Sequence, residues 1–108
     1  MTYNAGIADR VVKVLEGRES LTERKMFGGI TFMLNGNMCC GVTNDDLMVR
    51  VGAGGLEDAL DQPHARPMDF TGRPMKGFVF VDAGAVGDRV LRRWIQRGVI
   101  FAESLSAK

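Results

Sequence analysis

The sequence predicts an α+β fold, in which helices pack on an antiparallel sheet. Amphipathic helical patterns stand near the two ends of the chain, over residues 3–16 and 85–105. Between them, short apolar runs alternate with brief turn signals rich in Gly, Asn, Asp and Pro. Links this short join antiparallel neighbours, because a parallel pair needs a crossover of about a dozen residues or more. The expected order of elements is α-βββ-α-ββ-α, with a three-stranded meander followed by a second hairpin.

Each expected element has its own signal. The first helix ends near Gly17, and residues 18–24 are predicted to form a polar connection. Asn35-Gly36 between two apolar runs is typical of a type I′ hairpin turn, in which both central residues need a positive φ. The other predicted elements are strands at 26–34, 37–43 and 47–52, a short helix at 56–61, a hairpin at 68–81 turning at 72–74, and a last helix at 85–105.

The register of the meander predicts that both faces of the sheet are largely apolar. A two-residue turn places Met33 opposite Met38 and Thr31 opposite Cys40. A four-residue second loop then places Val42 opposite Leu47 and Cys40 opposite Val49. Either helices cover both faces, or one face meets a partner. We expect a homodimer, because an exposed apolar patch usually marks an interface. The face expected to form it carries Ile30, Phe32, Leu34 and Met48.

Composition bounds the class of protein. The 108 residues fit one domain, 1–108, and a net charge of +1 provides no overall attraction to nucleic acid. No segment is apolar enough for a membrane span, and the N-terminus lacks a signal sequence, so we expect a cytoplasmic protein with no membrane partner.

The two cysteines, Cys39 and Cys40, are adjacent, which argues against a disulfide framework. Neighbouring strand residues point to opposite faces, so we expect reduced thiols that do not share a metal ion. We expect no metal, no cofactor and no catalytic residue. The alternative is a small enzyme in which His64 and Asp69 activate Cys39.

Two other groups of residues are candidates for binding. The segment from His64 to Lys76 is dense in functional groups and is predicted to be a loop that binds an anion or ligand. Its candidate residues are His64, Arg66, Asp69, Arg73 and Lys76. Four arginines share the side of the last helix opposite its apolar arc, and they could contact phosphates, an acidic partner, or solvent and acidic side chains such as Glu16, Glu19 or Glu23. These arginines are Arg89, Arg92, Arg93 and Arg97.

The stretch KMFGGITFMLNGNMCCGV, residues 25–42, resembles the N-terminal domain of the TfoX/Sxy family, named for regulators of bacterial competence genes. Further matching segments are Leu47–Val51, Ala65–Met68 and the helix around Trp94. The resemblance implies an α+β domain that stands alone here, because the family's helical C-terminal domain has no counterpart in the sequence. It implies no catalytic residues. Similar domains are compared with secretion chaperones that dimerise and bind other proteins. We therefore expect a non-enzymatic regulatory or protein-interaction domain, with a nucleic-acid-binding module as the alternative.

Overall fold

The computed structural model describes residues 3–18, 20–26, 28–70 and 73–105, with side chains of residues 69–75 outside that description. Its helices are α1 (Ala5–Leu15), α2 (Leu56–Leu60) and α3 (Asp88–Glu103), with 3-10 turns at Ala53–Gly55 and Ala83–Ala85. Its strands are β1 (Leu21–Met26), β2 (Gly29–Leu34), β3 (Asn37–Thr43), β4 (Asp46–Arg50), β5 (Ala65–Phe70) and β6 (Arg73–Asp82).

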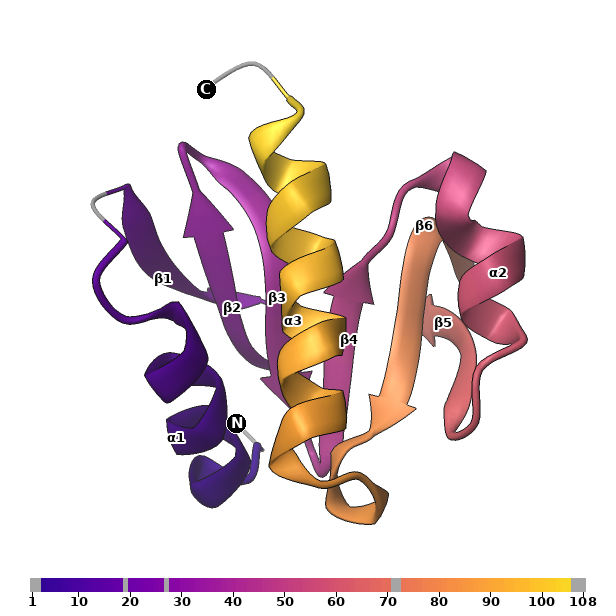
Figure 1. Cartoon of the computed structure of the whole chain (residues 1–108), viewed down its shortest axis with the longest axis horizontal. Helices are drawn as coiled ribbons and strands as arrows, with labels where there is room; N and C mark the ends of the chain where they lie inside the picture. The colour runs from indigo at the N-terminus through magenta and orange to yellow at the C-terminus, as the bar shows by residue number, and fades with distance from the viewer. Residues whose placement is uncertain (1–2, 19, 27, 71–72, 106–108) are drawn as a thin grey trace.

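The strands form one antiparallel sheet in the order β1-β2-β3-β4-β6-β5, so the predicted α+β class is confirmed. Helices α1 and α3 contact each other and lie on one face of the sheet, with α3 crossing β3 and β4 (Figure 1). Helix α2 packs instead on β5 and β6, at the opposite end of the sheet from α1.

Strand β1 corrects the prediction that residues 18–24 form a connection. The strand pairs along its whole length with β2, from Leu21 opposite Leu34 to Met26 opposite Gly29. Its four central side chains, Thr22–Lys25, are all exposed. An edge strand whose two faces are both exposed to solvent does not alternate between apolar and polar residues. Charged residues on such a strand protect its free edge from pairing with other chains. The pattern used to find buried strands therefore missed it.

The predicted type I′ turn is confirmed at Asn35 and Gly36, whose φ angles are +53° and +80°. The next turn is tighter than predicted: β3 ends at Thr43, which pairs with Asp46, so the loop has two residues rather than four. Its first residue, Asn44, also adopts a positive φ, which asparagine tolerates better than most residues. The predicted turn of the second hairpin includes Gly72, which lies outside the described residues.

A β-bulge at Cys39 changes the register predicted for the meander. Met33 lies opposite Met38 as expected, but Phe32 lies opposite Cys40, which leaves Cys39 as the extra residue. Thr31 therefore pairs with Gly41, and the prediction that it opposes Cys40 is wrong. One extra residue moves every later side chain of the strand to the other face relative to β2. The predicted division of residues between the two faces fails for this reason.

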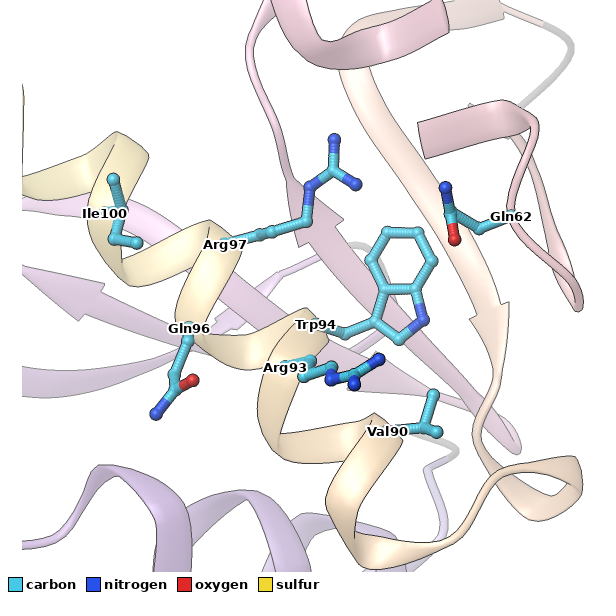
Figure 2. A pocket seen from close by; sticks show the side chains of 7 residues that line it. All are labelled: Gln62, Val90, Arg93, Trp94, Gln96, Arg97 and Ile100. Carbon is cyan, nitrogen blue, oxygen red and sulfur yellow. The ribbon is translucent and has the colours of Figure 1, made fainter. Parts of the chain in front are cut away.

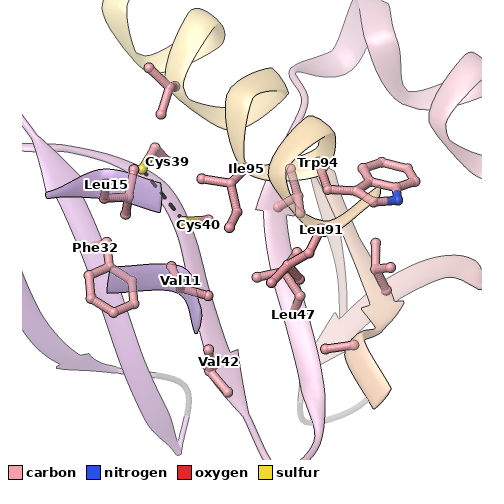
Figure 3. Close-up of a cluster of buried hydrophobic side chains, with 14 of the residues drawn as sticks. Val11, Leu15, Phe32, Cys39, Cys40, Val42, Leu47, Leu91, Trp94 and Ile95 are labelled. Carbon is pink, nitrogen blue, oxygen red and sulfur yellow. Dashed lines mark hydrogen bonds between the residues drawn. The ribbon is translucent and has the colours of Figure 1, made fainter. Parts of the chain in front are cut away.

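Among the described residues, the core consists of two clusters on opposite faces of the sheet. The larger lies under α1 and α3 (Figure 3) and includes Ile30, Phe32 and Leu34, all buried. Met48 belongs to the smaller cluster, with Met33, Met38 and Met68. The prediction that Ile30, Phe32, Leu34 and Met48 share one face available to a second copy is therefore wrong, because the chain's own helices cover the first three.

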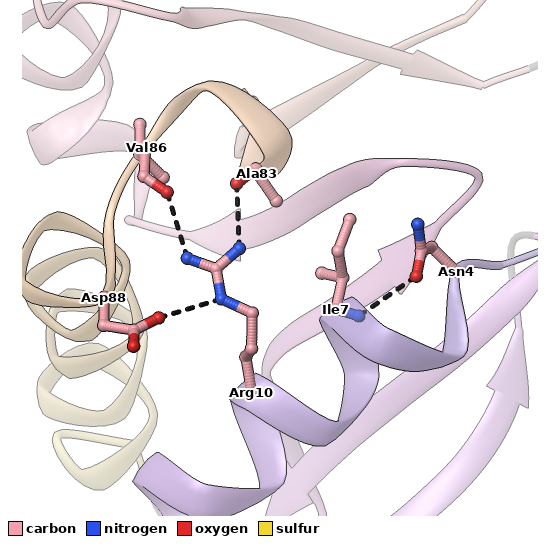
Figure 4. Close-up of polar contacts among 6 residues, drawn as sticks. All are labelled: Asn4, Ile7, Arg10, Ala83, Val86 and Asp88. Carbon is pink, nitrogen blue, oxygen red and sulfur yellow. Dashed lines mark hydrogen bonds and ion pairs between the residues drawn. The ribbon is translucent and has the colours of Figure 1, made fainter.

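Local interactions define where the helices begin. The side chain of Asn4 caps α1 by accepting hydrogen bonds from the backbone N–H groups of Gly6 and Ile7, at 2.9 and 3.2 Å (Figure 4). Helix α3 begins at Asp88, later than the predicted residue 85, since residues 83–85 form a 3-10 turn. Gly87 is its N-cap and provides no side-chain acceptor.

Candidate functional site: a groove along helix α3

A groove runs along the side of α3 that faces α2 and the start of β5. Two adjoining cavities, of about 370 and 380 Å³, make up the groove and share four lining residues. These are Gln62, Val90, Arg93 and Trp94. Figure 2 shows the indole of Trp94 between α3 and the segment that carries Gln62. The helix thus provides one wall and the α2–β5 connection provides the other.

Arg97 anchors one end of this groove. Its guanidinium donates hydrogen bonds to Asp58 Oδ2 at 3.1 Å and to the carbonyl oxygen of Gly55 at 3.2 Å. The same group lies 5.4 Å from the ring centroid of Trp94, within the range of a cation–π contact. Three partners hold the guanidinium in one orientation, so Arg97 links α3 to the α2 region and fixes the wall of the groove.

Two large apolar side chains that border the groove are exposed to solvent. Val90 is 38% exposed and Ile100 is 69% exposed, and they are the only exposed large hydrophobic residues among those the structure describes. Both line the same cavity as Trp94, which is only 4% exposed. Isolated surface hydrophobics are common, but two that flank a concave aromatic wall are typical of a binding site.

The charge of the groove is positive. Arg93 is exposed, lines both cavities, and has no hydrogen-bond or ion-pair partner within the described part of the chain. His64 lines the second cavity next to Pro63. Its φ of +67° is unusual for a residue with a side chain and marks the sharp turn at which the chain enters β5. An unpaired cation beside exposed apolar side chains can bind a group that is both acidic and apolar.

The structure divides the predicted basic face. Arg89, Arg92 and Arg93 are exposed along α3, whereas Arg97 is partly buried and paired with Asp58 rather than with a glutamate of residues 16–23. Arg92 lines a different hollow, between α1 and α3, together with Arg10 and Lys13. Of the four arginines, only Arg93 and Arg97 line the groove.

The predicted ligand loop is not a loop, because most of it forms the β5–β6 hairpin. Arg66 makes a bidentate ion pair with Asp46, at 2.6 and 3.2 Å, and lies 5.0 Å from the ring centroid of Phe80. Phe80 packs against the smaller core cluster, so Arg66 lies on that face of the sheet. His64 instead lines the groove beside α3, on the other face. Lys76 is exposed on β6, and the side chains of Asp69 and Arg73 lie outside the described residues.

The cysteine pair lies in the larger core cluster, away from the groove. Both thiols are fully buried, and the bulge brings their sulfur atoms to 3.7 Å from each other (Figure 3). The hydrogen bond with Cys40 lowers the pKa of Cys39, an effect that burial opposes and the charge of Arg18 assists. The same hydrogen bond and burial raise the pKa of Cys40. Within the described ranges, no three His, Cys, Asp or Glu side chains are grouped to hold a metal ion.

Some residues of the groove were not found from the sequence. Ile100 lies seven positions after Arg93 and four after Gln96, which places it on the polar stripe of α3 rather than on its apolar arc. An isoleucine on the polar side of a helix indicates a possible binding surface, so the sequence did contain a signal for Ile100. Gln62 and Asp58 carried no local signal, because only the packing of α2 brings them to α3.

One of three comparisons with known proteins identifies the family of this chain. A search of curated proteins and a search of solved structures each gave no match. Among the described helices, none combines the length and apolar character needed to cross a membrane. The model of the TfoX N-terminal domain matches residues 13–102, which include β1 to β6 and nearly all of α3. The chain therefore belongs to the TfoX N-terminal domain family.

Proposed function

We propose that this domain is a non-enzymatic protein-interaction module, of the kind found in competence regulators, that docks an acidic and partly apolar peptide segment in the α3 groove. One observation carries the proposal: Ile100 and Val90 are exposed on either side of the buried indole of Trp94. Arg93, which has no partner among the described residues, lies beside them. Burying apolar side chains supplies most of the affinity of a peptide groove, and a charge at its rim selects the partner.

Trp94 provides a direct assay, because it is the only tryptophan of the chain. The probe is a synthetic amphipathic peptide with leucines on one helical face and glutamates on the other. We expect its binding to change the fluorescence of Trp94, and a version with lysines in place of the glutamates to bind at least tenfold more weakly. No response to the acidic peptide at millimolar concentration would count against this function.

Neighbouring arginines supply a matched pair of variants. Arg93→Glu removes the free cation of the groove and is expected to weaken the acidic peptide tenfold or more, which corresponds to about 1.4 kcal/mol. Arg92→Glu makes the same change of charge outside the groove and is expected to alter affinity by about twofold or less. Equal losses in the two variants would indicate general electrostatic attraction instead of docking in the groove.

Nucleic acid binding is the second candidate, because Arg89, Arg92 and Arg93 are all exposed on one helix and have no partner among the described residues. A phosphate backbone would be contacted by all three, so each single variant to glutamine would weaken binding to a similar extent. Its affinity would also fall steeply with salt. The exposed Ile100 on the same stripe favours a protein partner, since a phosphate backbone provides it with no apolar contact.

The catalytic alternative would require His64 and Cys39 in a single cleft. His64 lines the groove beside Trp94, whereas Cys39 is fully buried on the strand beneath α3. This separation supports binding rather than catalysis. A homodimer remains a prediction without an assigned face. Light scattering at tens of micromolar tests it, with a mass near that of one chain counting against it.

A further inference from the structure

Another hollow, of about 160 Å³, lies between α1 and α3, on the side of α3 that faces away from α2 (Figure 1). The proposed docking function does not use it. Each helix contributes one stripe of side chains to its walls, since residues three and four apart share a helical face. The lining residues are Arg10, Lys13 and Val14 of α1, and Asp88, Leu91 and Arg92 of α3.

The lining of this hollow is strongly positive. It contains three cations, and Asp88 is the one acidic residue among the described residues that line it, so its net charge is +2. The Asp88 side chain is 89% exposed, so water screens much of its charge. Cations that share one hollow repel each other, and an anion bound between them removes that repulsion.

Arg10 is the fixed cation of the hollow. Its guanidinium donates hydrogen bonds to Asp88 and to the backbone carbonyl oxygens of Ala83 and Val86 (Figure 4). A guanidinium has five N–H groups, so these three bonds leave it with further donors for an anion. Because the same bonds hold the side chain in place before a ligand arrives, binding immobilises it at little further cost in entropy.

The other two cations stand on opposite walls of the hollow and are free to bind a ligand. Lys13 of α1 and Arg92 of α3 are both exposed, and neither has a hydrogen-bond or ion-pair partner within the described ranges. A guanidinium matches the geometry of phosphate oxygens with paired N–H groups, and an ammonium group supplies a mobile point charge.

We propose that this hollow binds a phosphate group, held by Arg10, Lys13 and Arg92. A phosphate ester carries a charge of about −1.5 to −2 at neutral pH and three strong acceptor oxygens, which match the net charge of the lining and its three cations. The volume is well below the roughly 300–1,000 Å³ of a pocket for a drug-sized ligand, so it suits one small anion. Val14 and Leu91 give the carbon atoms of a small ester an apolar wall.

The test titrates inorganic phosphate into the isotope-labelled full chain and follows backbone amide signals by NMR. We expect saturation with a Kd of about 1 mM or tighter, and the largest shifts in α1 and at the start of α3. Acetate and chloride at equal ionic strength should bind at least about tenfold more weakly, because they lack the charge and the three oxygens. Phenyl phosphate distinguishes the source: tighter binding than inorganic phosphate assigns an ester, and equal binding assigns the phosphate group alone. Shifts that chloride or acetate reproduces would overturn the proposal.

Single substitutions separate a built site from diffuse attraction. Lys13→Gln and Arg92→Gln should each weaken phosphate binding by about tenfold or more and, since both side chains are exposed, leave far-UV circular dichroism unchanged. Arg89→Gln is the matched control, because Arg89 is exposed on the same helix but does not line the hollow. Asp88→Asn should tighten binding by about threefold, since it removes the opposing carboxylate while Arg10 keeps its two carbonyl acceptors. Equal losses in the Arg89 and Arg92 variants would show that no specific site exists, and weaker binding by Asp88→Asn would contradict the proposed arrangement.

Discussion

Gly98 of α3 packs directly against the backbone carbonyl of Cys39, the residue at the centre of the β3 bulge. A methyl group added at Gly98 would overlap the carbonyl oxygen and lie 3.1 Å from the carbonyl carbon. The helix can approach the strand this closely only because the residue at the contact has no side chain. This contact fixes the height of α3 above the sheet, and with it the position of the groove.

We predict that Gly98→Ala destabilises the protein by about 2–3 kcal/mol, because overpacking a rigid backbone contact forces the helix away from the strand. Gly54→Ala is the matched control, since a side chain there meets open space. Urea denaturation followed by circular dichroism measures both. If the two variants unfold at the same urea concentration, α3 can move away from the strand without loss of stability.

Replacing Gly36 with Val should destabilise the chain by about 1–3 kcal/mol, since a β-branched residue is strained at a φ of +80°. Gly36→Asn is the control, because asparagine tolerates positive φ and should cost less. Thermal unfolding of both variants checks the order. A valine variant as stable as the asparagine variant would contradict the type I′ geometry of this turn.

The N-cap of α3 offers a stabilising change. Gly87 has a φ of −79°, suitable for any residue, and no atom lies near the place of an added side chain. A serine hydroxyl there can accept a hydrogen bond from a free N–H of the first turn, so Gly87→Ser should stabilise by about 0.3–1 kcal/mol. Gly87→Ala, which adds the side-chain carbon without the acceptor, is the control. A melting temperature of the serine variant at or below that of the alanine variant would refute this prediction.

Arg10 joins α1 to the start of α3 through three hydrogen bonds (Figure 4). It donates to Asp88 Oδ1 at 2.9 Å and to the carbonyl oxygens of Ala83 and Val86 at 3.1 and 3.0 Å. Arg10→Met should cost about 2–3 kcal/mol, because it leaves two partly buried carbonyls without their donor. Asp88→Asn should cost about 1 kcal/mol or less, since the Asp88 side chain is 89% exposed. Urea midpoints that fall equally in both variants would place the stabilisation in the ion pair instead.

The two cysteines should differ in reactivity. Because the pKa of Cys39 is lowered and that of Cys40 is raised, the Cys39 thiolate is populated at a lower pH. Under native conditions at mildly alkaline pH, iodoacetamide should therefore modify Cys39 first, and the preference should disappear in urea. Peptide mapping by mass spectrometry measures the ratio. Equal labelling of the folded protein would mean that global unfolding, not the pKa of each thiol, controls access.

The sequence by itself determined the α+β class, the order of the large elements and the Asn35-Gly36 turn, because periodicity and turn chemistry are local. It also placed Arg93 and Arg97 on one helix, since helical geometry relates residues three or four apart.

Only tertiary structure decided which face of the sheet is covered. One bulged residue, Cys39, reverses the faces between β2 and the next strand, and Gly98 of α3 packs closely against the carbonyl group of that residue. The groove likewise depends on α2 being folded back onto β6, which brings Asp58 to Arg97 across 39 positions of sequence. No local pattern encodes a contact of that range, because it results from burying apolar surfaces that belong to separate elements.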